Sequence, residues 1–378
     1  MRRVLVYAPR VLPVSQTFVA DQARQLRRWT AELAGAERVP GGLPIDDLLA
    51  PEMEEVTVAS RFGRLARQAT RRVPELGRIV AARPPDLIHA HFLTGGFDVA
   101  ASVPPVPCPV VVTAHGFDAT WFGSPPATLR PQQWLHGAMR RSLLRRPFHF
   151  VAVSGFIRDR LIAHGAPPER VVVHHTGVDT SVFVPPPPGT PRHGIVFVGR
   201  LVPKKGALDL LQAVARLRAE GTVVTVAVIG DGPHRRDLES FVRRERLDVE
   251  FRGAVARPAV LEAMQGAAVL CNPSRQGPDG DREGFGMVLA EAQATGLPVV
   301  ATRSGGMVDA VDAGRTGVLV PEGDPVALAA ALRSCLTDDA LRTRLGAAAR
   351  PWVLEHFDLA RQTAALEYKY DEWAGRGA

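Results

Sequence analysis

The sequence predicts an α/β protein with two doubly wound parallel sheets, and three observations support this fold class. Short, almost wholly apolar segments recur along the 378 residues, as expected for strands buried on both faces. Each is followed by glycine or polar residues and then by a stretch with helical periodicity. The alternation continues through both halves of the chain, with a stiff proline-rich break between them, which favours two domains over one large sheet.

The first half of the chain supplies four predicted strands. They are Val4–Ala8, Leu87–Ala90, Val110–Ala114 and Phe150–Val153. The first strand follows two arginines, as in a signal peptide, but its apolar run ends at Pro9, too early for the apolar region of such a peptide. A helix is predicted over Phe18–Arg28.

The second half continues the pattern. Its predicted strands are Gly194–Val198, Val223–Ile229, Val249–Arg252, Ala268–Cys271 and Pro298–Ala301. Its predicted helices are Leu208–Ala219, Arg235–Arg243 and Pro258–Gln265. Alternating strands and helices of this kind predict a parallel sheet with helices on both faces.

The proline-rich break sets the predicted domain boundaries. We expect a first domain over 1–184, a linker over 185–193 and a second domain over 194–351. Residues 352–378 are predicted to form a helix that packs back on the first domain, because the segment carries more aromatic residues than an exposed end needs. These are Trp352, Phe357, Tyr368, Tyr370 and Trp373.

Composition narrows the function classes. Hydrophobic residues make up 46% and charged residues 22% of the chain, which excludes a disordered protein. The net charge, 46 − 39 = +7, favours acidic partners such as nucleotides or anionic lipid, and no nucleic-acid-reading module is visible. The three cysteines form neither a disulfide framework nor a zinc-ligand pattern, and no stretch approaches about 18 apolar residues. We therefore expect a cytoplasmic protein.

One segment leaves a membrane contact open. Residues 61–73 place an apolar stripe among five arginines. This pattern suits an ordinary amphipathic helix of the first domain, and it also suits a helix that binds anionic lipid at the inner membrane face.

The most informative chemistry lies in residues 281–292, DREGFGMVLAEA. Gly284 and Gly286 permit a sharp turn, and the helix predicted from Met287 would present free N–H groups that bind an anion. Glu283 precedes this helix, and Glu291 lies about 7.5 Å beyond Gly286 along its axis at about 1.5 Å per residue. That separation suits a ligand with a sugar at one end and a ribose at the other. The alternative is a capped surface helix with two solvated glutamates.

Two further strand ends resemble ligand loops. Arg200 and Lys205 flank the loop after the strand ending at Gly199, where an arginine and a lysine can together bind a diphosphate. Residues 230–233, GDGP, follow the next strand in the same way. A basic loop and a plain strand-to-helix turn are the alternatives.

The sequence supports a metal site less well than a diphosphate site. Asp279 and Asp281 look like an Asp-x-Asp metal motif, but Arg200 and Lys205 already supply positive charge for a diphosphate, so we predict a loop without metal. His89 and His91 lie two apart on one strand without further ligands, and we expect core histidines or acceptor contacts there; the same holds for His174 and His175.

In combination, these motifs resemble the retaining glycosyltransferases of family 4, which have the GT-B fold, with two Rossmann-like domains facing a central cleft. Glu283 and Glu291 match that family's E-x7-E pair, and Arg200 with Lys205 match its diphosphate-binding pair. Further matches are GDGP at 230–233, Gly305–Gly306, and the segments 87–92, 113–118 and 152–154 of the first half. The nearest resemblance is to the branch acting in exopolysaccharide and cell-surface polysaccharide assembly. Gln16 and Thr176 depart from the family pattern on the acceptor side.

The resemblance implies a role for each matched residue. Arg200 and Lys205 would bind the diphosphate and stabilise it as the leaving group, and Glu291 would bind the ribose. Glu283 and His115 would contact the donor sugar as further catalytic residues. The turn and helix start that would hold the sugar and phosphate are Gly284, Phe285, Gly286 and Met287. The loop that would meet the base is Gly253, Ala254 and Val255. The acceptor-side residues would be Ser15, Gln16, His91 and Ser154.

The resulting expectation is a metal-independent, retaining hexosyltransferase without a cofactor. It would transfer a sugar from a UDP- or GDP-sugar to a hydroxyl acceptor, which could be a glycan, a lipid-linked acceptor or a small molecule. Two enzyme alternatives are a natural-product tailoring transferase and a transferase similar to sucrose-phosphate synthase. The non-enzyme alternative is a protein that binds a sugar nucleotide or dinucleotide without catalysis. No G-x-G-x-x-G follows the first strand, which argues against the dinucleotide.

Overall fold

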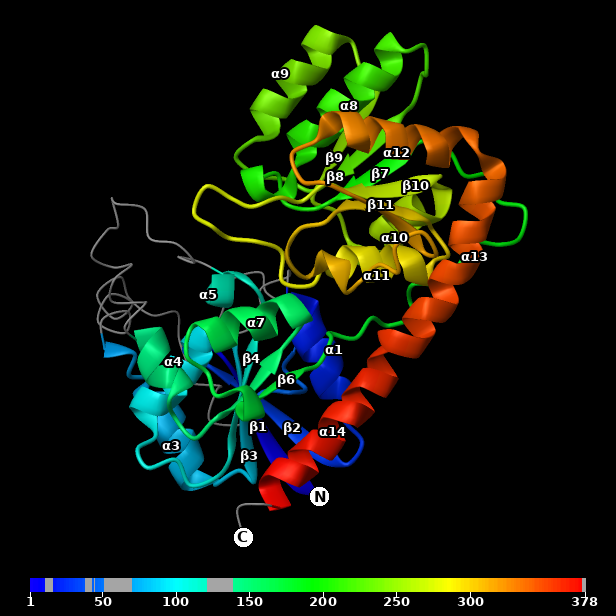
Figure 1. Cartoon of the computed structure of the whole chain (residues 1–378). Coiled ribbons are helices and arrows are strands. Elements are labelled where there is room, and N and C mark those ends of the chain that lie inside the picture. Colours follow the sequence, from blue (N-terminus) through cyan, green and yellow to red (C-terminus); the bar gives the residue numbers. More distant parts are fainter. Residues whose placement is uncertain (11–15, 38–42, 44, 51–69, 121–138, 376–378) are drawn as a thin grey trace. The chain divides into compact units, whose positions relative to one another are not determined.

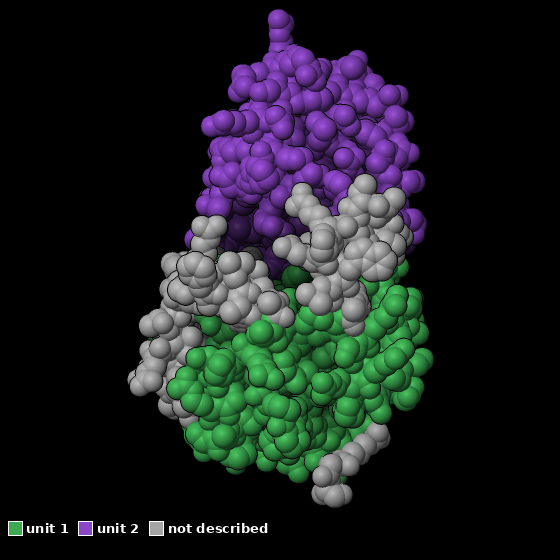
Figure 2. Space-filling model, turned by 90° about the vertical axis from the view of Figure 1, so that its left-hand side faces the viewer, with its two compact units in different colours: residues 1–177, 359–378 green, residues 178–358 purple. Residues whose placement is uncertain are grey.

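The structure is a computed structural model that describes residues 1–10, 16–37, 43, 45–50, 70–120 and 139–375 (Figure 1). The chain divides into two compact units, coloured separately in Figure 2. Unit 1 comprises Met1–Gly177 and Leu359–Ala378, and unit 2 comprises Val178–Asp358.

Unit 1 contains a six-stranded parallel sheet with the strand order β2-β1-β3-β4-β5-β6. The strands are β1 (Arg2–Ala8), β2 (Trp29–Gly35), β3 (Leu87–His91), β4 (Val110–Ala114), β5 (His149–Ala152) and β6 (Val171–Val173). The four strands predicted from the sequence are the four inner ones. All of β3 and β4 is buried, as expected when helices cover both faces of a parallel sheet.

The helices of unit 1 include one from the far end of the chain. The helices are α1 (Thr17–Gln25), α3 (Pro74–Ala82), α4 (Phe92–Ser102), α5 (Phe117–Thr120), α7 (Gly155–Ala163), η3 (Pro168–Arg170) and α14 (Leu359–Gly375). The buried Glu367 of α14 accepts hydrogen bonds through Oε1 from the backbone N–H groups of Arg27, Arg28 and Trp29, at 2.8, 2.7 and 3.0 Å. These bonds fix α14 at the start of β2.

Unit 2 contains a second six-stranded parallel sheet, with the order β12-β11-β10-β7-β8-β9. The strands are β7 (Ile195–Val198), β8 (Val226–Ile229), β9 (Val249–Gly253), β10 (Val269–Asn272), β11 (Val299–Thr302) and β12 (Gly317–Val320). All five strands predicted for this half are present. The edge strand β12 was not among them.

Helices lie on both sides of this sheet, so unit 2 is doubly wound (Figure 1). The helices are η4 (Pro203–Lys205), α8 (Ala207–Ala219), α9 (Arg235–Glu245), α10 (Arg257–Gly266), α11 (Met287–Ala294), η5 (Gly305–Val308), α12 (Pro325–Thr337) and α13 (Asp339–His356). Phe197 and Val269 of the sheet pack with Leu210 of α8 and Leu332 of α12 in one buried apolar cluster. The two sheets agree with the fold class predicted from the sequence.

The units divide at other residues than the predicted boundaries of 184 and 351. Arg350 donates hydrogen bonds to the carbonyl oxygens of Phe183 and Thr180, at 2.9 and 3.2 Å, which attaches residues 178–184 to unit 2. The helix predicted over 352–378 is two helices, because α13 continues through Pro351 to His356 and α14 begins at Leu359. Residues 352–358 therefore belong to unit 2.

One sequence prediction concerns a membrane contact of residues 61–73. None of the helices within the described ranges combines the length and apolar character needed to cross a bilayer. Residues 61–69 of the predicted basic helix lie outside the described residues, so its lipid contact stays a prediction.

Candidate functional site

The basic loop of unit 2 follows β7. It runs through Gly199 and Arg200 into η4, which carries Lys204 and Lys205 and leads into α8. Arg200 is exposed and forms no ion pair within the part of the chain that the structure describes. Lys205 directs Nζ at Oε2 of Glu283, at 2.7 Å, with the two side chains only 17% and 16% exposed. One cation is therefore open to solvent, and its neighbour is engaged with a carboxylate.

The acidic loop follows β10 and ends at α11, which begins at Met287 as predicted. Gly286, at the N-cap, has φ 86°, a left-handed conformation that favours glycine. The Gly306 N–H donates to the carbonyl oxygen of Glu283 at 2.9 Å, and a Cβ on Gly305 would lie 2.2 Å from that oxygen. The two glycines of η5 thus allow a close approach that fixes the backbone of Glu283.

Electrostatics keep Glu283 ionised. Burial by itself raises the pKa of this carboxyl, but nearby positive charge outweighs burial and holds the pKa below its ordinary value. That charge comes from Lys205, Lys204 and Arg200. The site therefore holds a carboxylate surrounded by cations at the start of a helix.

The start of α11 is suited to an anion. The Leu289 N–H bonds to the Gly286 carbonyl oxygen at 2.9 Å, and Gly286 has no side chain to cap the earlier N–H groups of the first turn. The buried ring of Phe285 packs edge-on against Phe357, with 5.1 Å between ring centroids, and holds the turn in place. Glu291 is half-buried, just over one turn into the helix.

The loops after β8 and β9 lie at the next strand ends of the same sheet. The Gly230 N–H donates to the Gly253 carbonyl oxygen at 2.7 Å, so the two loops are directly bonded. Ala254 is exposed and Val255 half-buried. These loops and the basic loop follow adjacent parallel strands. Gly253–Val255 and Arg200 therefore lie at the same end of the sheet, where the carboxyl ends of the strands meet.

The Asp-x-Asp segment does not gather metal ligands. Asp281 pairs with Lys204 at 2.7 Å, and Asp279 accepts the Asp281 N–H through Oδ1 at 3.2 Å. Among the residues whose placement is described, no group of three histidine, cysteine or acidic side chains could hold a metal ion. Sequence reasoning missed Lys204, because its contact with Asp281, 77 residues further along the chain, depends on how two loops meet.

Unit 1 gathers histidines at the ends of β3 and β4. His89 is buried between the Tyr370 hydroxyl, 2.5 Å from Nδ1, and the Thr113 hydroxyl, 2.6 Å from Nε2. His91 stacks on His89 and brings Nδ1 within 2.9 Å of Nε2 of His115. Burial lowers the pKa of His91 to about 3. Burial, and to a smaller extent the electrostatic interaction with His91, holds the pKa of His115 well below its usual value. These imidazoles are neutral hydrogen-bonding groups.

The predicted acceptor-side residues have separate environments. Ser154 is buried and caps α7, with its hydroxyl oxygen accepting the Ile157 N–H at 3.2 Å. Gln16 precedes α1 and is half-buried. His91 lines a hollow of about 10 Å³, room for about one water molecule. Ser15 lies outside the described residues.

Two family models match the chain. Residues 15–182 match the model described as Glycosyltransferase Family 4, and residues 192–338 match the one described as Glycosyl transferases group 1. Each model thus falls almost entirely on one half of the predicted two-domain arrangement.

Curated relatives of this chain also carry the names of glycosyltransferases. WcaL of Salmonella typhimurium, which carries the name of a colanic acid biosynthesis glycosyltransferase, is 35% identical over 60% of this chain and 58% of its own length. The match to WcaL of Escherichia coli covers 48% of that protein, so the chain spans about half the length of these two relatives. The GDP-mannose-dependent alpha-(1-6)-phosphatidylinositol monomannoside mannosyltransferase of Mycobacterium tuberculosis is 30% identical over 64% of this chain and 73% of its own length. The chain belongs to the family 4 glycosyltransferases.

A solved structure supports the fold. HepE of Anabaena, crystallised in complex with UDP, matches with a TM-score of 0.75 over 98% of this chain and 100% of its own, at 21% identity. The fold is GT-B, as the motif resemblance implied.

Proposed function

We propose that this glycosyltransferase transfers a hexose with retention from a UDP- or GDP-sugar to a hydroxyl acceptor, without a metal ion. The observation that carries the proposal is the Lys205–Glu283 pair at the start of α11, beside the exposed Arg200. A site that keeps two cations next to the N-terminus of a helix is suited to a diphosphate.

Donor binding would begin with an exchange of partners. The diphosphate carries more negative charge than one carboxylate, so it would replace Glu283 as the partner of Lys205 while Arg200 closes on it from solvent. Glu283 would then be released toward the sugar hydroxyls, next to the backbone of Gly284–Met287. Glu291 would bind the ribose, and the loop at Gly253–Val255 would meet the base.

The main catalytic contribution would be electrostatic. As the bond between the sugar and the diphosphate breaks, negative charge grows on the leaving oxygen, and Arg200 and Lys205 would stabilise it. This positive charge comes from side chains, so no metal ion is required. The neutral His115 would hydrogen-bond to the donor sugar without adding charge, and the acceptor would attack the face that the diphosphate leaves.

The relatives suggest the substrate class. HepE binds UDP, the mycobacterial relative depends on GDP-mannose, and the name of WcaL refers to colanic acid biosynthesis. We therefore propose a role in polysaccharide or glycoconjugate assembly, with acceptor contacts from Ser15, Gln16, His91 and Ser154.

The test starts with binding. UDP, GDP and ADP are screened by thermal shift; a ligand at a hundredfold excess over its Kd stabilises the protein by about 2.7 kcal/mol. We expect UDP or GDP to raise the midpoint and ADP to have little effect. The matching sugar donor is then supplied with candidate oligosaccharide acceptors, and the anomeric configuration of the product is determined by NMR. An inverted product, or no response to any nucleotide, would contradict the proposal.

Chelation tests the metal independence. EDTA should leave most of the transfer activity intact. Complete loss of activity, restored by Mg²⁺ or Mn²⁺, would instead make Asp279 and Asp281 metal ligands.

A further inference from the structure

Three consecutive charged residues before α11 each bind a different partner. Asp281 pairs with Lys204 at 2.7 Å, and Glu283 pairs with Lys205 at the same distance. Arg282, between them, pairs with Glu322 at 3.0 Å. The two carboxylates, two residues apart, thus meet the two adjacent lysines of η4.

Of the two lysine–carboxylate pairs, Lys204–Asp281 is slightly more buried than Lys205–Glu283. Both side chains are 14% exposed. The backbone repeats the connection, since the Arg275 N–H donates to the Lys204 carbonyl oxygen and the Gly277 N–H to that of Asp281, each at 2.8 Å. Loss of one partner from a largely buried pair leaves an uncompensated charge, so breaking this contact should displace the segment.

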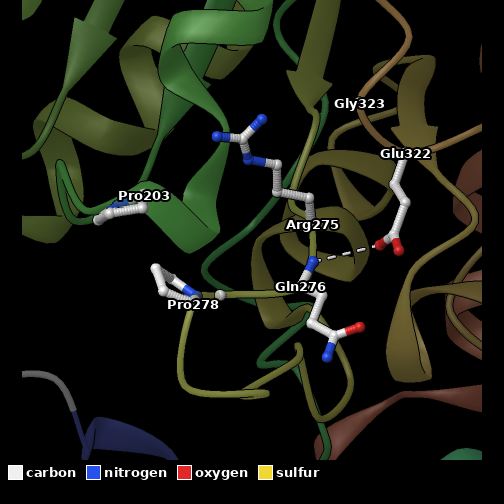
Figure 3. Close-up of a pocket in the computed structure, with 7 residues that line it drawn as sticks. Pro203, Arg275, Gln276, Pro278, Glu322 and Gly323 are labelled. Carbon is white, nitrogen blue, oxygen red and sulfur yellow. Dashed lines mark hydrogen bonds between the residues drawn. The ribbon is translucent and has the colours of Figure 1, made fainter. Parts of the chain in front are cut away.

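The chain just before the segment borders open space. Residues of this loop, together with Pro203 and Glu322, line a cavity of about 310 Å³. Figure 3 shows the Glu322 carboxylate directed at the backbone N–H of Gln276, a 3.2 Å hydrogen bond. The loop thus borders this cavity on one side and is followed by the ion-paired residues 281–283.

These contacts matter most when the donor is bound. If the diphosphate takes Lys205, Glu283 loses its partner at the moment when its carboxylate must face the sugar. The Lys204–Asp281 and Arg282–Glu322 pairs do not involve the displaced lysine and can persist.

We propose that Lys204 and Asp281 are positioning residues, whose ion pair keeps Glu283 aimed at the donor sugar after Lys205 has transferred to the diphosphate. The inference rests on the proposed function of the Lys205–Glu283 site. It assigns Asp281 a lysine partner in place of the metal ion that an Asp-x-Asp motif suggests.

The test separates binding of the diphosphate from use of the sugar. K204M and D281N each break the pair, and the exchange variant K204D/D281K rebuilds it with the net charge unchanged. Calorimetry gives the Kd for UDP and GDP. The release of UDP from UDP-glucose or of GDP from GDP-mannose, as the sugar is transferred to a hydroxyl of the oligosaccharide acceptor, gives kcat. R216M, which removes the exposed Arg216–Glu220 pair of α8, is the matched control.

We expect both single variants to lower kcat by about tenfold to a hundredfold, the effect of a misplaced reactive group, while the Kd of the bare diphosphate changes by less than about threefold. The affinity for the full donor relative to the bare diphosphate should fall as well. The exchange variant should recover most of kcat, K204R should retain it, and R216M should match the wild type.

Several outcomes would overturn the inference. These are normal kcat in K204M and D281N, equal losses in K204R and K204M at an unchanged unfolding midpoint, or an exchange variant that folds but stays as slow as the single variants. A D281N defect corrected by added Mg²⁺ would also do so. R200A and K205A distinguish the two proposals: if both leave diphosphate affinity normal, the proposed donor site itself fails.

Discussion

Lys205 and Glu283 form a 2.7 Å ion pair that joins the loop after β7 to the loop after β10. These strands are neighbours in the sheet of unit 2. The pair therefore connects two residues 78 positions apart at the carboxyl ends of the strands. Because Lys205 is already occupied, an incoming diphosphate competes with a carboxylate of the protein itself. This competition makes the two sides of the site separable by mutation.

Loss of either cation should weaken nucleotide binding and turnover together. R200A and K205A each remove a charge that faces the diphosphate both before and during its departure. We expect a loss of about 1.5–3 kcal/mol in the affinity for UDP or GDP, the usual contribution of a hydrogen bond to a charged group. Calorimetry measures this loss, with R216M as control. Normal affinity in both variants would exclude the proposed diphosphate site.

The two glutamates of the E-x7-E pair should behave in opposite ways. E283Q leaves Lys205 without its carboxylate, so bare diphosphate should bind as tightly as to the wild type or a few-fold more tightly, while kcat falls. E291Q should weaken the bare diphosphate by about 1–3 kcal/mol, through loss of a hydrogen-bonding partner of the ribose. Calorimetry and donor kinetics on the same preparations compare them. Identical binding defects would show that the assumed orientation of the donor is wrong.

The histidine cluster should make stability depend on pH. Burial holds the pKa values of His89, His91 and His115 below 6.5, so the unfolded chain binds protons that the folded unit does not. Stability is then complete above about pH 6.5 and falls as the pH drops toward the folded value of about 3 for His91.

This dependence can be measured by denaturant unfolding at several pH values below 6.5. H91Q should reduce the slope by up to about 1.4 kcal/mol per pH unit, the contribution of one proton. H193Q, which replaces an exposed histidine of unit 2, is the control. An unchanged slope in H91Q would mean that this imidazole is protonated in the folded unit.

Removal of the Glu367 carboxylate should destabilise unit 1. E367A leaves three backbone N–H groups, those of residues 27–29, without their acceptor at the start of β2. We expect a loss of about 2–3 kcal/mol, because at least one of these donors would stay buried and unsatisfied. Thermal unfolding measures it, and E372Q, which alters a half-buried residue of the same helix, is the control. An equal effect of both substitutions would deny Glu367 its anchoring role.

The inner strands of both sheets could be predicted from the sequence, but three edge strands could not. Inner strands such as Val110–Ala114 are buried on both faces and are continuously apolar. The edge strand β2 contains the polar Thr30 and Glu32, and Glu32 pairs with Arg3 of β1 at 2.7 Å. β6 has only three residues. Such segments form strands because they pair with a neighbouring strand. The local sequence pattern does not reveal that pairing.

The candidate site was predictable as separate motifs and not as contacts. Arg200, Lys205, Glu283 and Glu291 were each identified from glycine-rich strand ends. The pairing of Lys204 with Asp281 depends on how two loops meet, which no local spacing specifies. The division at Gly177 depends likewise on the hydrogen bonds of Arg350, a residue far along the chain.

The hydrogen bonds of Glu367 also bear on the order in which the protein can form during synthesis. Unit 1 is discontinuous, since α14 emerges from the ribosome only after all of unit 2. The backbone N–H groups at the start of β2 gain their acceptor only after about 340 further residues have been synthesised. Unit 2 is one uninterrupted stretch of chain and can fold as it is made, so it behaves as an insertion into a partner that is completed last. A fragment ending at residue 358 should therefore retain the folded second unit and lose the first.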